Sequence, residues 1–588
     1  MNTFLGHFKM KVPVLICFFI LFSLCSSSKP PLEIKVADFG ALPNDGKNDE
    51  PAIISAIDVC RSKENTKLIF EWGIYDINGG QKNERGRSQP SIDIKNIKNM
   101  TIEGNGAEFI GHDFSTMFNF TECHNITIKN LTVDWDPIPF TQGKVVSIGD
   151  DYVDIEVTAP STANTGCRTE GLLGYDLERR RMARRYTDHY QSGFKKTTEV
   201  IRPGVMRHFV GREHRFAGKM PSAGQYIIAR HQIYGNQALQ FSKCSKIQIE
   251  NVNIYSNPGM GVVARLSRDF YIRHLRVMIR PGSGRWMSCT ADATNFRGCR
   301  GSIVMENCLF EGMGDDATNV RSGSYMVIAE RLEDRKLSIS SGARGGFPSE
   351  PEVGDKLELS GEDKMLVPYA TMTVKSVNRN EKEKTLIVEF DDKLPEKTRE
   401  GDIVGNASAC PFLHIRGCTV IRNRARGLII KNRGAIVEDC YFQDITASAI
   451  GMNTDITTWW ESIGSHDIII RNNRFLNCRF DPDVVRGVIE CSTNPGSNQN
   501  APAGVHQRIK IENNIIQGSN ANAIKIGSAD GVVIHNNIID QIKDEAILIY
   551  NSRNVRLTGN KITNSNIGLK IGKGCDTATI KAENNIGF

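Results

Sequence analysis

Residues 509–519 read IKIENNIIQGS, residues 532–542 read VVIHNNIIDQI, and residues 555–565 read VRLTGNKITNS. Each stretch begins 23 residues after the one before, and apolar residues alternate with polar ones on both sides of an asparagine. Alternation with a period of two predicts β-strands rather than helices. A fixed repeat of this length indicates stacked supersecondary units.

The same pattern continues upstream in IRGCTVI (415–421) and IVEDCYF (436–442), where Cys418 and Cys440 lie 22 residues apart. Leucine-rich repeats share this period, but their leucine consensus is missing here and β-branched residues dominate. No helical pattern of about ten residues fits between these strands. The repeats therefore predict an all-β fold, a right-handed parallel β-helix whose coils stack about 4.8 Å apart. The recurring asparagines, Asn514, Asn537 and Asn560, are expected to form a ladder at the turns.

Two segments interrupt the repeat pattern. The first contains KVVSIGDDYVDIEV (144–157) and the second contains MTVKSVNRNEKEKTLIVEF (372–390), and both alternate like antiparallel strands joined by charged turns. We interpret both as small β-barrel domains inserted into the β-helix. The expected organisation is a signal peptide at 1–28, β-helix coils at 29–136, a barrel-like insertion at 137–235, coils with catalytic acids at 236–322, a second barrel at 323–406, and coils at 407–588.

The N-terminus has the features of a secretory signal. Lys9 and Lys11 precede the apolar stretch VPVLICFFILFSLC, and small and polar residues follow it. The stretch is shorter than the roughly 20 residues of a membrane-spanning helix. We therefore expect export to the periplasm or surface of a bacterium. Cys25 follows the bulky Leu24, which disfavours a lipid anchor at this cysteine.

Charge and cysteine content exclude several classes. The net charge of +6 over 588 residues is mild, and no basic run or motif indicates nucleic-acid binding. Of 15 cysteines, Cys17 and Cys25 belong to the signal segment, and the other thirteen form no CxxC pairs. This spacing argues against a zinc site or a disulfide scaffold. Buried free thiols that pack as small apolar side chains are expected instead.

Acidic residues recur in the frame Asp-Ala-Thr-Asn. Asp292 lies in CTADATNF, Asp316 lies 24 residues later in GDDATNV, and Asp315 stands beside it. If one coil takes 22 to 24 residues, Asp292 and Asp316 occupy the same position on neighbouring coils of the outer wall. Isolated acids at turns are commonly solvated corners, but stacked like charges are unfavourable without a purpose. Carboxylates that share a site have different pKa values, as an acid and base pair requires.

These stretches resemble known families. VADFGALPNDGKNDEPAI (36–53) is similar to the opening motif of pectin-degrading and phage-tailspike β-helices, and the three aspartates resemble the acid trio of polygalacturonases. The mature chain as a whole resembles glycoside hydrolase family 110, the bacterial α-1,3-galactosidases. DWDPIPFTQGKV (134–145), GRWMSCTADATNFRGCRGSIVMENC (284–308) and FEGMGDDATNV (310–320) carry that resemblance. The Gly-His-Gly triplet of polygalacturonases is missing, which counts against a uronic-acid substrate.

The resemblance implies a β-helix with two inserted barrels and hydrolysis of terminal α-1,3-linked galactose, as on branched blood group B glycans and on linear α-1,3-galactosyl glycans. It also implies that Asp315 is the general acid and that Asp292 and Asp316 hold the attacking water, which gives inversion at the anomeric carbon. Carboxylates alone can supply both proton transfers, so we expect no metal or organic cofactor. The partner is a glycan or glycoconjugate.

Sugar binding needs aromatic faces and planar polar groups. Trp459 and Trp460 stand together in a loop, NTDITTWWESIG, where both cannot easily be buried, so at least one is a candidate for stacking on galactose. Asn295 and Asn319 follow the acids, and the ladder role is favoured for them over orienting the carboxylates. The weaker candidates are Glu490, Asp134 and Asp136.

Two other functions are compatible with the sequence. A β-helix hydrolase or lyase for acidic polysaccharides would bind calcium through clustered acids and use a basic residue as the catalytic base. The trio shows no evident arginine or lysine at the next coil position, which disfavours the lyase. A non-catalytic glycan-binding surface protein would keep its function after Asp315 is replaced by asparagine.

Overall fold

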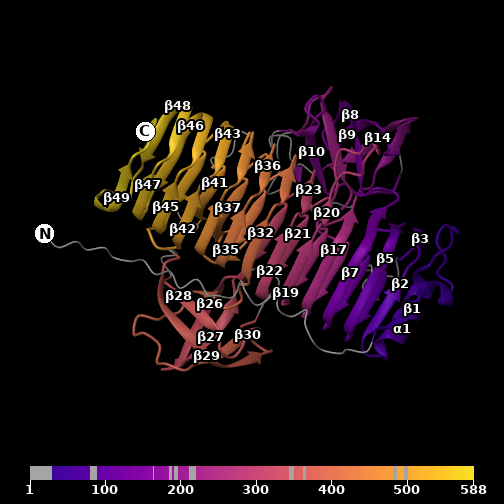
Figure 1. Cartoon of the computed structure of the whole chain (residues 1–588), viewed down its shortest axis with the longest axis horizontal. Coiled ribbons are helices and arrows are strands. Elements are labelled where there is room, and N and C mark those ends of the chain that lie inside the picture. Colours follow the sequence, from indigo (N-terminus) through magenta and orange to yellow (C-terminus); the bar gives the residue numbers. More distant parts are fainter. Residues whose placement is uncertain are drawn as a thin grey trace.

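The computed structural model describes residues 30–79, 89–162, 165–183, 189–190, 196–210, 220–342, 350–361, 366–457, 459–480, 487–494 and 501–588. The expected signal segment, with Cys25, lies outside these residues. The described chain forms one long right-twisting stack of parallel strands with two insertions on opposite sides (Figure 1). The predicted parallel β-helix is confirmed.

Each coil contributes strands to three parallel sheets. Neighbouring strands in a sheet come from successive coils, as in the register Thr294↔Thr318 and Val262↔Thr294. The first sheet, which carries the site described below, contains β4 (Ile92–Lys95), β6 (Phe118–Thr121), β16 (Leu239–Ser242), β18 (Val262–Arg265), β21 (Thr294–Arg297), β24 (Thr318–Arg321), β34 (Leu428–Lys431), β37 (Ile450–Asp455), β41 (Ile489–Asn494) and β44 (Ile524–Gly527).

The second and third sheets complete the coils. The second contains β1 (Leu32–Lys35), β2 (Thr66–Ile69), β5 (Lys98–Gly111), β7 (His124–Trp135), β17 (Ser245–Ile254), β19 (Arg268–Arg273), β22 (Arg300–Glu306), β32 (Phe412–Arg416), β35 (Arg433–Glu438), β39 (His466–Arg471), β42 (His506–Glu512), β45 (Ala529–His535), β47 (Arg553–Thr558) and β49 (Ile580–Glu583). The third contains β3 (Gly73–Ile77), β20 (Arg276–Val277), β23 (Leu309–Glu311), β33 (Thr419–Ile421), β36 (Tyr441–Gln443), β40 (Arg474–Leu476) and β43 (Ile515–Ser519). The long strands β5, β7 and β17 run on into the third sheet, and β46 (Ile538–Tyr550) and β48 (Lys561–Ile571) span the third and first sheets.

Stacked aromatic side chains hold the first sheet in register from inside. The rings of Phe120 and Phe241 lie 4.8 Å apart, and Phe270 lies 5.6 Å from Phe241 and 5.4 Å from Phe296. All four rings are fully buried. Because side chains alternate between the two faces of a strand, an inward Phe296 directs its neighbours Asn295 and Arg297 to the outer face.

At one turn of the β-helix, asparagine and cysteine side chains from successive coils stack in a column inside the coils. Asn473, Asn514, Asn537 and Asn560 are buried, and each side-chain amide donates to the next side-chain oxygen at 2.9–3.0 Å. The predicted asparagine ladder is confirmed. One coil upstream, Cys440 takes the same position and its backbone N–H donates to Asn473. The thirteen described cysteines are all free, as expected.

One α-helix lies in the described residues, and the sequence analysis did not anticipate it. Helix α1 (Glu50–Arg61) places Ile53, Ala56, Ile57 and Cys60 on one buried face, which is helical spacing. It lies at the N-terminal end of the β-helix (Figure 1) and packs against β1, β2 and β4. The short 3₁₀ helices η1 (Val36–Phe39) and η3 (Thr577–Thr579) lie in the first and last coils.

The first insertion is an antiparallel sheet with the order β11-β10-β15-β8-β9-β14-β13, and β12 pairs with β10. The first and last strands of this sheet, β11 and β13, are not paired with each other among the described residues. The insertion is therefore an open sheet and not the barrel that we expected. The strands are β8 (Phe140–Ile148), β9 (Tyr152–Val157), β10 (Gly171–Asp176), β11 (Arg181–Met182), β12 (His189–Tyr190), β13 (Glu199–Arg202), β14 (Val205–Phe209) and β15 (Tyr226–Arg230).

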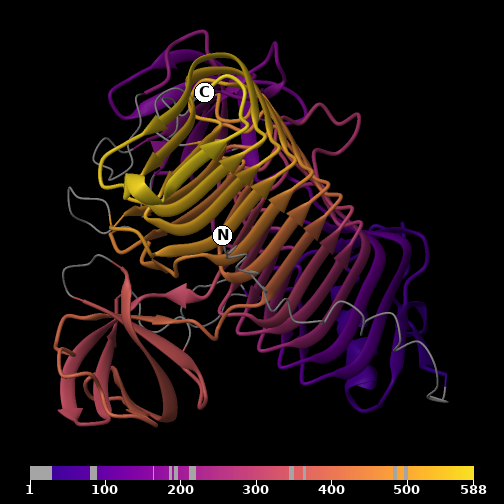
Figure 2. The same cartoon turned by 60° about the vertical axis from the view of Figure 1, so that its left-hand side comes forward.

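The second insertion is a closed barrel with its own apolar core, and Figure 2 shows it standing beside the coils. It leaves the β-helix after β24 and returns at β32. The barrel strands are β26 (Met326–Glu333), β27 (Lys336–Ser341), β28 (Lys356–Ser360), β29 (Pro368–Asn380), β30 (Thr385–Phe390) and β31 (Ile403–Asn406). A short pair, β25 (Gly323–Ser324) and β38 (Glu461–Ser462), ties its base to a loop from a later coil.

Candidate active site

Three carboxylates meet at the turns that lead into β21 and β24. The backbone N–H of Ala293 donates to the carbonyl of Asp316 at 2.9 Å, so Asp292 and Asp316 stand on neighbouring coils as their shared frame predicts. Asp315 precedes Asp316 in the same turn. Each aspartate offers one carboxylate oxygen, and these oxygens all lie within 4.8 Å of one another. The structure therefore brings the three predicted catalytic residues together.

The acids are buried, which corrects the expectation of side chains open on the outer wall. Asp292, Asp315 and Asp316 are 4%, 7% and 1% exposed. The cover over Asp315 comes from both sides. The hydroxyl of Tyr234 donates to its Oδ2 at 2.7 Å, and Arg424 lies 3.2 Å from its Oδ1. Tyr234 follows the last strand of the first insertion, β15, and no repeat pattern in the sequence connects it to the acids.

Arg426 holds Asp316 from the next coil. Its Nε and Nη2 each lie 2.7 Å from a different oxygen of Asp316, a bidentate pair, and its backbone N–H donates to Oδ1 at 3.1 Å. The statement that no arginine or lysine stands at the next coil position was wrong. The barrel separates the two coils by 110 residues in sequence, and this interruption hid the alignment. RNRARGLII (422–430), in register with the strand after Asp316, was the available signal.

Asp292 and Asp315 differ in the direction in which their surroundings shift the pKa. Burial, then the neighbouring charges of Asp316 and Asp315, raise the pKa of Asp292 well above its usual value. Burial also acts to raise the pKa of Asp315, but Arg424, Arg426 and the Tyr234 hydroxyl outweigh it and lower that pKa. The site thus combines two carboxyl groups whose pKa values are shifted in opposite directions within a few ångströms, as acid and base catalysis requires.

Asn295 orients the acid before it, contrary to the favoured ladder role. Its side-chain N–H donates to Asp292 Oδ2 at 2.7 Å. Asn319 is in register with Asn295 on the next strand, but its Oδ1 is buried and has no hydrogen-bond partner among the described residues. An orphan acceptor beside the carboxylates is suited to a sugar hydroxyl.

The two tryptophans have different surroundings. Trp459 is 53% exposed, and its backbone N–H donates to Asp455 at the end of β37 in the first sheet. Trp460 is half-buried and packs with the apolar cluster around Tyr325, whose backbone N–H donates to the Trp460 carbonyl at 2.8 Å. Of the two, Trp459 is therefore the more accessible to a sugar.

Glu490 lies on β41, in the same row of the first sheet as Asn319 but three strands further on, or about 14 Å at the usual strand spacing. Its carboxylate is buried and accepts from Ser448 at 3.0 Å. The structure does not bring Glu490 into the acid cluster.

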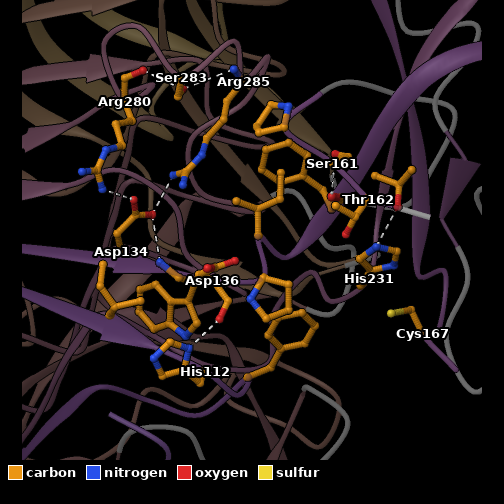
Figure 3. A pocket seen from close by; sticks show the side chains of 18 of the residues that line it. His112, Asp134, Asp136, Ser161, Thr162, Cys167, His231, Arg280, Ser283 and Arg285 are labelled. Atoms are coloured by element: carbon orange, nitrogen blue, oxygen red, sulfur yellow. Dashed lines mark hydrogen bonds and ion pairs between the residues drawn. The ribbon is translucent and has the colours of Figure 1, made fainter. Parts of the chain in front are cut away.

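Asp134 and Asp136 line a separate cavity of about 540 Å³ between the early coils and the first insertion (Figure 3). Asp134 forms ion pairs with Arg285 at 2.7 Å and with Arg280 at 2.9 Å, and His112 bridges Asp76 and the carbonyl of Asp136. None of the three catalytic candidates lines this cavity. We therefore assign Asp134 to a structural ion-pair network.

Comparison with known proteins shows what the chain as a whole is similar to. The family described as "right handed beta helix region" matches residues 403–586. The chain is 28% identical over 538 residues to α-1,3-galactosidase A from Shewanella woodyi, covering 86% of this chain and 85% of that protein. Its relatives are α-1,3-galactosidases. Another, α-1,3-galactosidase B from Bacteroides thetaiotaomicron, is 26% identical over 478 residues, or 75% of each chain. The resemblance to this family is confirmed.

A solved structure with a similar outline is a family 28 exopolygalacturonase from Yersinia enterocolitica, at 10% identity and a TM-score of 0.46, covering 95% of this chain and 79% of that chain. No helix within the described part of the chain is long and apolar enough to cross a membrane.

Proposed function

We propose that this protein is an exo-acting glycoside hydrolase that removes terminal α-1,3-linked galactose from glycans. The observation that carries the proposal is the cluster of three carboxyl groups on adjacent coils, with one oxygen of each within 4.8 Å of the others, in which the pKa of Asp292 is raised and that of Asp315 is lowered. The α-1,3-galactosidases to which the chain is similar across most of its length supply the substrate class. Blood group B structures and linear α-1,3-galactosyl glycans are the two substrates proposed. We also propose that the N-terminal segment directs export.

Two assignments of the proton donor among the three aspartates are compatible with the cluster. The resemblance to family 110 assigns proton donation to Asp315, whereas the raised pKa of Asp292 favours that residue as the donor. An aryl α-galactoside with a nitrophenol leaving group separates them, because such a leaving group departs without a proton. The donor is the residue whose change to asparagine greatly slows hydrolysis of the disaccharide but largely spares the aryl galactoside. The residue that orients the water slows both.

Inversion is proposed for the stereochemistry. Retention needs an ionised carboxylate nucleophile. Asp316 is ion-paired with Arg426, Asp315 is held by Arg424 and Tyr234, and the pKa of Asp292 is raised. These partners restrain each carboxylate, which favours attack by a water that the carboxylates orient and deprotonate. The closest carboxylate oxygens of the three acids lie nearer together than the roughly 6.5–9.5 Å that separates the two carboxyl groups of typical inverting enzymes. The anomeric form of the released galactose therefore has to distinguish inversion from retention. Proton NMR of the first galactose released should show the β anomer, and an α anomer would mean that one acid is a nucleophile.

The lyase is the second candidate, because Arg426 stands where its catalytic base is required. Burial acts against the charge of Arg426, but Asp316 and then the other two acids raise its pKa above that of free arginine. A guanidinium held this firmly in its charged form does not accept a proton. Activity on pectin that is lost in chelator and restored by calcium would favour the lyase instead.

The deciding experiment is incubation with linear galactosyl-α-1,3-galactose and with the fucosylated branched trisaccharide, followed by identification of the released sugar. We expect free galactose from at least one of them. Asp292→Asn should release none, and Asp544→Asn, an exposed acid in a distant coil, should behave as the wild type. Galactose release that persists in Asp292→Asn would contradict the proposal.

A further inference from the structure

Four basic side chains form a row on the outer face of the first sheet. Arg265, Arg297, Arg321 and Lys431 occupy the last position of β18, β21, β24 and β34, and the backbone register places them directly beside one another. Neighbouring strands lie about 4.8 Å apart, so these like charges are stacked at short range. Such a row is unfavourable unless negative groups compensate it.

Carboxylates of the described residues form ion pairs with only two of the four basic side chains in this row. Glu461 pairs with both Arg321 and Lys431 through its two oxygens. Arg265 and Arg297 have no ion pair among the described residues, and the side chain of Arg297 contacts only Ser324 Oγ, at 3.3 Å. The Nε of Arg297 and the Nε of Arg321 are buried without a hydrogen-bond partner. Burial and the charges of Arg321 and Arg265 lower the pKa of Arg297 to about 9.

Arg297 lies on the same strand as a residue that contacts the acid cluster. Arg297 follows Asn295 by two positions on β21, about 7 Å along the strand, and Asn295 donates to Asp292. Exposure increases along the row from the buried Lys431 through the half-buried Arg297 to the exposed Arg265. A glycan whose terminal galactose is at the carboxylates can thus present a neighbouring group to Arg297 and Arg265.

We propose that Arg297 and Arg265 bind an anionic substituent, a sulfate ester or a sugar carboxylate, carried by the substrate next to the bond that is cleaved. Two adjacent guanidinium groups offer planar forks of N–H donors that match an oxyanion. A bound anion would supply the negative charge that this half of the row lacks. The inference deepens the proposed function and rests on it for the identity of the sugar, but the anion site itself does not depend on hydrolysis.

The binding test uses galactose, galactose 6-sulfate and galacturonic acid, each titrated calorimetrically into the full-length protein. We expect at least one anionic sugar to bind tenfold or more tightly than galactose. Arg297→Gln should reduce that advantage to threefold or less. Arg265→Gln, at an exposed position that tolerates substitution, should reduce it as well. The matched control is Arg474→Gln, an exposed arginine on β40 of the third sheet, which should keep the full advantage.

The sulfate and carboxylate arms identify which oxyanion the site prefers. Equal affinity for galactose and both anionic sugars in the wild type would overturn the proposal, as would an undiminished advantage in Arg265→Gln. Hydrolysis is measured separately, as the ratio of kcat/KM for a sulfated and a neutral α-1,3-galactoside. A tenfold fall of this ratio in Arg297→Gln supports the proposal. An equal loss on both substrates would instead mean that the arginine contacts galactose itself. Anion binding without hydrolysis would refute only the proposed function.

Discussion

The molecule contains two polar columns built on the same repeat, and they behave in opposite ways. Asn514, Asn537 and Asn560 stack on consecutive coils and are fully buried, with each amide both donating and accepting within the column. Asp292 and Asp316 stack on consecutive coils just as regularly. Their charges repel, and Asp316 requires Arg426 from another segment as its partner.

The difference follows from the chemistry of the two side chains. An amide carries both donors and an acceptor, so a stack of amides satisfies itself and needs no other residue. An ionised carboxylate only accepts, and two stacked carboxylates repel unless a proton or a cation intervenes. The repeat therefore determines where the side chains of a column stand. The type of side chain decides whether the column stabilises the fold or forms a reactive site.

The largest expected effect is on catalytic activity, which should depend on the aspartate column and not on the asparagine column. Asp292→Asn should lower kcat/KM on galactosyl-α-1,3-galactose by about 10⁴-fold, since proton transfer contributes up to about that factor. Asn537→Ala, in the amide column, should leave kcat/KM within twofold of the wild type. Initial rates of galactose release measure both. An equal loss in the two variants would mean that the contrast between the columns is false.

The next effect concerns stability in the acid column. Arg426→Met should lower the free energy of unfolding by about 3 kcal/mol, because it leaves Asp316 buried without its partner. Urea denaturation followed by circular dichroism gives this value. Arg474→Gln, which removes an exposed arginine, should change it by less than about 0.5 kcal/mol. An unchanged midpoint in Arg426→Met would show that the cluster is neutral when unliganded.

A smaller loss is expected in the amide column. Asn537→Ala removes the oxygen that accepts from both the backbone N–H and the side-chain N–H of Asn514, which should cost about 2 kcal/mol. Asn566→Ala removes a similar amide that is exposed to solvent and donates to the carbonyl of Lys543 at 2.9 Å, so it serves as the control. Its loss should be below about 0.5 kcal/mol. Equal losses would show that the buried ladder contributes no more than a surface contact.

Substitution of Trp459 tests whether a residue outside the two columns contributes to substrate affinity but not to the free energy of unfolding. Trp459→Ala should raise KM about tenfold, with little change in kcat or in the urea midpoint, because an exposed ring stacked on a sugar contributes only when the sugar is bound. Trp459→Phe should restore most of the affinity. A fall in kcat with an unchanged KM would instead connect this loop to the chemical step.

The smallest effect is a change in the pH dependence of stability. The folded protein raises the pKa of Asp292, so it holds this proton more tightly than the unfolded chain does. The stabilisation is complete below the unfolded value of about 3.9 and is lost as the pH rises through the folded pKa. Asp292→Asn, permanently neutral, should lose less stability than the wild type between pH 4 and 7. Parallel curves of unfolding free energy against pH would place the proton elsewhere.

The sequence allowed the scaffold to be predicted because its information is local and periodic. The alternation in each coil and the 23-residue spacing predicted the β-helix and the asparagine ladder, and the repeated Asp-Ala-Thr-Asn frame predicted the pairing of Asp292 with Asp316. The partners of the acids were missed. Tyr234 lies 81 residues from Asp315 and Arg426 lies 110 residues from Asp316. A repeat period does not carry across an insertion, and packing of an inserted sheet onto the coils is not periodic.

The barrel also bears on how the site assembles during folding. The coils that hold Asp316 and Arg426 are joined by a connection that runs from Arg321 to Phe412, and a flexible loop of that length would oppose closure with a sizeable entropy. Strands β26 and β31, where the insertion begins and ends, are paired at Met326↔Val404. Once the barrel has folded, its ends are already adjacent, and the remaining closure is that of a short turn. We therefore expect the barrel to fold before the two halves of the acid cluster meet, so it acts as an internal template for the active site.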